Sequence, residues 1–221
     1  MINIWFMDFL SFIAEVILIT SSGALSPGPL SVATFSEGAK RGWVSGFFAA
    51  LGHTVVELPL VLLLATGLSG FIALEENRGI IAFLGGASLL AYSILQLMDA
   101  VRVWREKTVI KASSSYRGGF YVGVILSALN PFFLIWWATV GIKLVVDALS
   151  LFNSILVAVL VLYIAHVWMD YAWLTFLSYL GYKGKTLGFK KMAFILLLSS
   201  IVLAYFGFEF IASAVRELFS S

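Results

Sequence analysis

The two histidines of this sequence are each followed, four positions later, by an acidic residue: His53 by Glu57, and His166 by Asp170. On an α-helix, residues four apart lie on the same face, one turn from each other. Both pairs fall inside long apolar stretches, where ionisable side chains are costly and usually functional. Imidazole and carboxylate groups in this arrangement can exchange a proton, bind a cationic group or ligate a metal ion. The structural alternative is a neutral histidine that hydrogen-bonds the acid of its own helix and serves only packing.

A proline motif precedes each of these pairs. The first is Ser26-Pro27-Gly28-Pro29, and the second is Asn130-Pro131. Proline lacks a backbone donor and clashes with the preceding turn, so each motif predicts an interrupted helix with free amides and carbonyls. At membrane depth such groups persist only where they line a cavity or are buried in protein. The alternative is a tolerated kink, which is more plausible for the single Pro131 than for the Pro-Gly-Pro motif.

The partial charges of the backbone at such a break suit both a carboxylate and an ammonium group. A half-helix that begins near Pro29 presents unpaired amides and the positive end of its dipole, which favour a carboxylate. The last carbonyls before the break carry the opposite partial charge and favour an ammonium group. Interrupted helices at matching places in two halves of a chain are typical of the binding site of a secondary transporter.

The elements that must position these residues are membrane-spanning helices. Hydrophobic residues make up 61% of the 221 positions and charged residues only 12%, far from the composition of soluble domains. A span needs about 20 apolar residues. The apolar runs predict six spans, near 8–35, 43–70, 79–101, 119–146, 151–181 and 190–214. The first run is not a cleavable signal peptide, because no Lys or Arg precedes it.

The basic residues predict the orientation in the membrane. Eleven lie at the ends joined by the loops after the first, third and fifth spans: Lys40, Arg41, Arg102, Arg105, Lys107, Lys111, Arg117, Lys183, Lys185, Lys190 and Lys191. Three lie at the other face: Arg78, Lys143 and Arg216. The positive-inside rule therefore places the basic face in the cytoplasm and both termini outside it, in a multi-pass protein of the cytoplasmic membrane. These basic loops are expected to contact anionic lipids, not nucleic acid.

The chain divides into two halves within one transmembrane domain, 1–221. A hydrophilic linker near 102–118 separates three spans (about 1–101) from three spans (about 119–221). An odd number of spans per half inverts the second half relative to the first. The predicted fold is thus an all-α bundle of two inverted three-helix repeats, in which the first and fourth spans are interrupted at proline. Such repeats have two near-equivalent packings, which is how alternating access arises.

Other features indicate packing. The pairs Gly42/Gly46, Gly119/Gly123 and Gly85/Gly86 predict closely packed helices. Gln96 and Asp99 lie toward the cytoplasmic end of the third span and are expected in solvent. Trp136 and Trp137 follow the Asn130-Pro131 motif, where they either wall a cavity or pack in the core or against lipid.

These motifs resemble those of the LysE-type translocator family. The matching elements are residues 26–29, the stretch 38–42, Gly52-His53 with Glu57, and Asn130-Pro131. The resemblance follows nearly the whole chain, although many characterised amino-acid exporters of the family have Gly-Asp where this chain has Gly52-His53. It implies a secondary transporter that exports amino acids or similar solutes, driven by the proton gradient.

On this interpretation the substrate-binding residues are Ser26, Pro27, Gly28, Pro29, His53, Glu57, Asn130, Pro131, His166 and Asp170, of which the two His–acid pairs also couple protons. The partners are a small-molecule substrate, protons and lipids, with a homodimer suggested by the small-residue faces. No cofactor or resident metal is expected, and no nucleophile or phosphate-loop motif indicates an enzyme. The alternatives are a divalent-metal exporter with the His and acid side chains as ligands, and a membrane scaffold that transports nothing.

Overall fold

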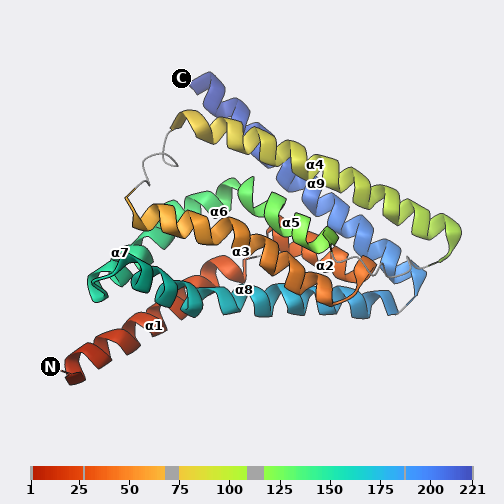
Figure 1. Ribbon diagram of the computed structural model, residues 1–221. Helices are drawn as coiled ribbons and strands as arrows, with labels where there is room; N and C mark the ends of the chain where they lie inside the picture. Colours follow the sequence, from red (N-terminus) through yellow and green to blue (C-terminus); the bar gives the residue numbers. More distant parts are fainter. Residues whose placement is uncertain (1, 27, 68–74, 109–116, 187, 221) are drawn as a thin grey trace.

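The computed structural model describes residues 2–26, 28–67, 75–108, 117–186 and 188–220, and all regular structure in these residues is helical (Figure 1). The order is α1 (Ile2–Ala24), α2 (Pro29–Arg41), α3 (Val44–Ala65), α4 (Glu75–Glu106), α5 (Arg117–Ala128), α6 (Pro131–Trp136), the π-helical turn η2 (Trp137–Gly141), α7 (Ile142–Leu151), α8 (Ile155–Thr186) and α9 (Phe189–Ser220). The prediction of an all-α fold is confirmed.

Several of these helices are long and apolar enough to cross a membrane. Five segments among the described residues qualify: Val44–Ala65, Ala82–Glu106, Pro131–Leu151, Ile155–Gly184 and Phe189–Arg216. Counted as one bent segment, α1 and α2 give a sixth. The outer surface is apolar too, since Leu18, Ile164 and Phe208 are 72%, 69% and 64% exposed. A surface of this kind fits a hydrocarbon solvent, and the chain is a multi-pass membrane protein.

Two helices begin at proline. Between the end of α1 at Ala24 and the start of α2 at Pro29 the helical axis turns by 72°. Between the end of α5 and the start of α6 at Pro131 lie two residues that are not helical. Proline fits the first turn of a helix, where its missing donor has no partner to lose. Pro59, by contrast, lies inside α3, so proline alone does not end a helix here. Pro27 lies outside the described residues.

Glycine residues allow several of the helices to touch backbone to backbone. A Cβ atom at Gly46 would overlap the carbonyl of Leu174 on α8, and one at Gly123 would overlap the carbonyl of Ala49 on α3. A Cβ atom at Gly119 would overlap the carbonyl of Ser45 on α3, one at Gly85 that of Leu129 just after α5, and one at Gly86 would meet Gly207 and Ile211 of α9. Close packing is therefore confirmed at these predicted positions. Gly42 is an exception: it has a φ of 99° and forms the turn between α2 and α3, with no atom near its missing side chain.

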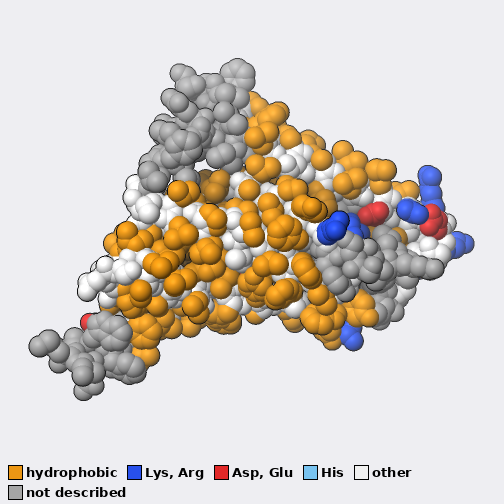
Figure 2. Space-filling view, viewed as in Figure 1, with side chains coloured by type: hydrophobic (Ala, Val, Ile, Leu, Met, Phe, Trp, Pro, Cys, Tyr) orange, Lys and Arg blue, Asp and Glu red, His pale blue; other side chains and the backbone are white. Residues whose placement is uncertain are grey.

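Basic side chains gather at one end of the molecule. Figure 2 shows one face covered by hydrophobic side chains, with Lys and Arg at the end where α4 finishes and α9 starts (Figure 1). Along their length α4 and α9 lie side by side, while α2 packs against α8 and α3 packs against α5. These pairings hold the basic ends of the helices together.

A buried ion cluster links α2 to α4 near this end. Lys40 Nζ lies 3.1 Å from Glu37 Oε1 and 3.1 Å from Asp99 Oδ2, and Arg41 Nε lies 2.5 Å from Glu37 Oε2. The Tyr92 hydroxyl donates to Glu37 Oε1 at 2.8 Å. Because side chains of α2 contact this face of α4, the expected exposure of the neighbouring polar residues is wrong. Gln96 is fully buried and donates to Ser36, and Asp99 is partly buried.

Candidate functional site

The two His–acid pairs, 113 residues apart in sequence, meet in the interior of the protein. His53 and Glu57 come from α3, and His166 and Asp170 come from α8; all four side chains are buried. The Nε2 atoms of His53 and His166 lie 3.0 and 3.1 Å from the same carboxylate oxygen, Glu57 Oε1. His166 Nε2 is also 3.4 Å from Asp170 Oδ2. The two pairs therefore form one cluster, which we call the His–acid quartet.

Glu57 is the hub of this quartet. Its Oε1 atom accepts a third contact, from the indole Nε1 of Trp137 at 3.1 Å. Trp137 is placed by η2, a π-helical turn of the kind often found at functional sites. Gly141 leaves room for its indole ring, since a Cβ there would overlap it. Trp136 and Trp137, the pair noted in the sequence, both line the cavity described below.

Each histidine is held at its other nitrogen by a hydroxyl group from the opposite half of the chain. His53 Nδ1 lies 2.7 Å from Ser127 Oγ on α5, and His166 Nδ1 lies 2.8 Å from Thr20 Oγ1 on α1. Thr20 lies on α1, the helix before the one that begins at Pro29. Ser127 lies on α5, the helix before the one that begins at Pro131. Neither was identified from the sequence. The signal that could have found them is a hydroxyl residue inside an apolar span, within ten positions before a break.

The hydrogen bonds at Ser127 fix one proton position. Its single hydroxyl hydrogen goes to the carbonyl of Gly123, at 2.6 Å. The contact to His53 therefore requires that the imidazole donates from Nδ1. His53 Nε2 faces Glu57 Oε1, so either the imidazole carries a second proton or the carboxyl group is protonated. In both cases an exchangeable proton lies between these two side chains.

Two acidic oxygens in the quartet have no hydrogen-bond partner. Glu57 Oε2 and Asp170 Oδ2 are both buried and accept no hydrogen bond, although Asp170 Oδ2 lies 3.4 Å from His166 Nε2. A buried, unsatisfied carboxylate oxygen is expensive and calls for a ligand or an ion. Both residues line the cavity, so a cationic group bound there would satisfy them.

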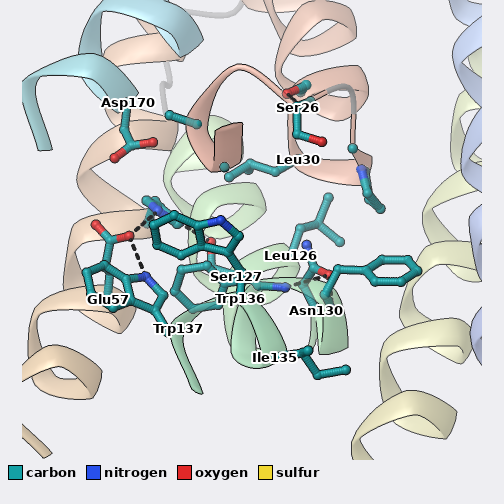
Figure 3. Close-up of a pocket in the computed structure, with 18 of the residues that line it drawn as sticks. Ser26, Leu30, Glu57, Leu126, Ser127, Asn130, Ile135, Trp136, Trp137 and Asp170 are labelled. Carbon is teal, nitrogen blue, oxygen red and sulfur yellow. Dashed lines mark hydrogen bonds and ion pairs between the residues drawn. The ribbon is translucent and has the colours of Figure 1, made fainter. Parts of the chain in front are cut away.

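The quartet forms one side of a cavity of about 540 Å³ (Figure 3). Residues in the first turns of both α2 and α6 line the cavity. Its lining includes the following predicted site residues: Ser26, Gly28, Pro29, His53, Glu57, Asn130, His166 and Asp170. Pro131 begins α6 but does not line the cavity, and Pro27 lies outside the described residues.

The helices that begin at Pro29 and Pro131 differ in whether the backbone amides of their first turn are free. Asn130 Oδ1 accepts from the amides of Phe132 and Phe133, at 3.0 and 3.4 Å, and so caps α6. At α2 the residue before the helix is Gly28, and no side chain caps the helix. The first amides of a helix have no partner within it. The start of α2 is therefore the better place for an anionic group.

Three of the quartet side chains also bring ligand atoms together. The nearest such atoms of His53, Glu57 and Asp170 all lie within 4.8 Å of one another. Two ligands held about 2.2 Å from one ion are at most about 4.4 Å apart. A small inward movement would thus let these side chains share a divalent cation.

Comparisons with known proteins agree with the membrane character of the chain. Residues 21–214 match the family model described as "LysE type translocator". A protein of Bacillus subtilis (strain 168), "Putative amino acid efflux protein YcgF", is 25% identical over 126 residues. That match covers 57% of this chain and 59% of the relative, so the chain spans about three fifths of the relative's length. No solved structure gives a significant match.

Proposed function

Since the chain belongs to the LysE type translocator family, we propose that it exports amino acids or similar small solutes from the cytoplasm, across the cytoplasmic membrane. The observation that carries this proposal is the meeting of the His–acid quartet and the uncapped start of α2 in one cavity. The substrate's ammonium group would bind Glu57 Oε2 and Asp170 Oδ2, the two buried carboxylate oxygens that accept no hydrogen bond. Its carboxylate would bind the first amides of α2. The name of the Bacillus subtilis relative supports the choice of substrate class.

The architecture that we propose is a single domain of two inverted repeats. In this description α1 with α2, and α5 with α6 to α7, are the two interrupted spans. The reciprocal hydroxyl contacts support it: α1 of the first half holds His166, and α5 of the second half holds His53. A pseudo-twofold axis through the quartet would relate these two contacts. Alternating access would then come from movement of one half against the other.

Proton antiport is the proposed driving force. Protonation of the quartet would compete with binding of the substrate's ammonium group, because both neutralise the same carboxylates. A proton that enters from outside and binds the quartet would release the substrate. When that proton leaves to the cytoplasm, the carboxylates would again be free to bind the substrate's ammonium group. The proton held between His53 and Glu57 is the one we assign to this exchange.

The test is flux in proteoliposomes loaded with a panel of labelled amino acids and diluted into acidic medium. We expect efflux driven by the pH gradient, abolished in Glu57→Gln and Asp170→Asn although both variants remain folded. Glu106→Gln is the matched control, because Glu106 is an exposed residue at the end of α4, paired with Arg102. Normal pH-dependent efflux in both quartet variants would contradict the assignment.

A second candidate is export of a divalent metal ion, favoured by the spacing of His53, Glu57 and Asp170. Zn²⁺ and Mn²⁺ flux, followed with an indicator dye in the same liposomes, separates the two functions. Metal flux without amino-acid flux would favour this candidate, and amino-acid flux alone would exclude it.

A further inference from the structure

The lining of the cavity is divided into a charged side and an apolar side. The quartet supplies all the Asp, Glu and His side chains of the described lining, which contains no Lys or Arg. The other side is mainly apolar and comes from α2, α5, α6 and α9, with Leu30, Leu126, Phe132, Ile135 and Phe206; its polar groups, such as those of Ser31 and Asn130, are uncharged. In Figure 3, Glu57 and Asp170 lie on one side, Leu126 and Ile135 lie on the other, and Trp136 stands between them.

Trp136 is held in this position by its neighbours. Its indole lies against Gly23 of α1, where a Cβ atom would come within 2.9 Å of the ring. Its Nε1 atom donates to Ser22 Oγ at 3.4 Å, and its ring meets that of Trp137 edge-on, with centroids 5.3 Å apart. The indole is thus a wall that a substrate bound at the quartet must contact.

This division determines which side chain a bound amino acid can have. With its ammonium group at the quartet and its carboxylate at α2, the side chain would enter the apolar part of the cavity. A charged side chain would lose water there without gaining a counter-ion, which is a large cost. An apolar side chain gains about fourfold in affinity for each methylene that it buries.

Resting on the proposed export function, we propose that the substrate is an amino acid with a large, uncharged, apolar side chain, branched or aromatic, and that Trp136 selects it. A small hydroxylated amino acid leaves most of the apolar surface unfilled. A basic or acidic amino acid is excluded by the missing counter-charge.

The experiment is counterflow exchange by the full-length protein in liposomes, with labelled leucine, phenylalanine, serine, lysine and aspartate as probes. We expect kcat/KM for leucine and phenylalanine to exceed that for serine at least tenfold, and no exchange of lysine or aspartate. In Trp136→Ala the ratio of phenylalanine to serine should fall at least tenfold, through KM. The matched control is Trp168→Ala, because Trp168 is a half-exposed tryptophan of α8 outside the cavity lining.

Two milder variants keep the proposal testable if Trp136→Ala does not fold. Gly23→Ala pushes the indole without removing it, and Trp136→Phe shortens it; both should lower the same ratio. Lysine or aspartate exchange as fast as leucine would overturn the assigned substrate class while leaving the export function intact. An unchanged ratio in every folded variant at these two positions would overturn the role of Trp136. Failure of the wild-type protein to exchange any of the five amino acids, while another member of the amino-acid panel shows efflux driven by the pH gradient, would overturn this inference alone.

Discussion

At the scale of single residues, the site depends on a carboxylate that two imidazoles share. Glu57 Oε1 receives His53, His166 and Trp137 within 3.1 Å. The side chain that completes the arrangement around His53 is Ser127, which is buried and four positions before Pro131. A hydroxyl with one hydrogen committed to a carbonyl can only accept from the ring, and this fixes the orientation of the imidazole.

We expect Ser127→Ala to destabilise the protein and to weaken proton coupling. The substitution leaves the Nδ1 hydrogen of His53 buried without an acceptor, which costs about 1–3 kcal/mol. Thermal unfolding in detergent and the pH dependence of efflux are the measurements. Ser150→Ala is the control, because Ser150 is exposed and donates only to its own helix. A Ser127→Ala protein with unchanged stability and an unchanged pH profile would contradict the role of this hydroxyl.

At the scale of elements, the packing between the cavity and the basic end depends on glycine. The contact of Gly123 with the carbonyl of Ala49 brings α5 against α3, one turn from His53. We expect Gly123→Ala to push these helices apart, to lower the midpoint of thermal unfolding and to reduce transport. Overpacking of this kind costs about 1–3 kcal/mol. Gly184→Ala is the control, because the new methyl group there meets only the flexible end of Ile195. Equal losses of thermal stability and of transport in the two variants would contradict this explanation.

The ion cluster of α2 and α4 should matter more than an exposed ion pair. Lys40→Met leaves the buried Glu37 with one cation fewer and Asp99 without its Lys40 partner. Removal of one partner of a buried pair costs about 3–5 kcal/mol. Arg102→Met breaks the exposed pair with Glu106, and we expect it to change stability by less than about 1 kcal/mol. The two changes are compared by unfolding in denaturant; similar losses would show that the cluster is not a stabilising contact.

At the scale of the whole molecule, the distribution of basic residues predicts the orientation. The chain has no cysteine, so a thiol reagent can label this protein only at a single cysteine that is introduced by substitution. We expect Asn153→Cys, in the turn between α7 and α8, to react with a membrane-impermeant maleimide from outside intact cells. Glu106→Cys, at the basic end, should react only after the cytoplasmic face is opened. The reverse pattern would place the termini in the cytoplasm and overturn the predicted orientation.

The features that the sequence could predict are those with a signal in the composition or in the spacing of nearby residues. The all-helical class and the chain's membrane character follow from composition and the length of apolar runs, because a lipid solvent requires internally satisfied backbone. The pairing of each histidine with the acid of its own helix follows from helical periodicity. Starts of helices at Pro29 and Pro131 follow from the chemistry of the ring, which suits the first turn.

Only the tertiary structure decided what these elements do together. No local pattern places Thr20 or Ser127 on a histidine from the other half, since those contacts join residues 146 and 74 positions apart. The burial of Gln96 depends on its contact with Ser36 of α2, 60 positions away in the sequence. The same holds for the single oxygen of Glu57 that two histidines share. Sequence determined which groups had to avoid lipid, and long-range packing decided which partners each of them found.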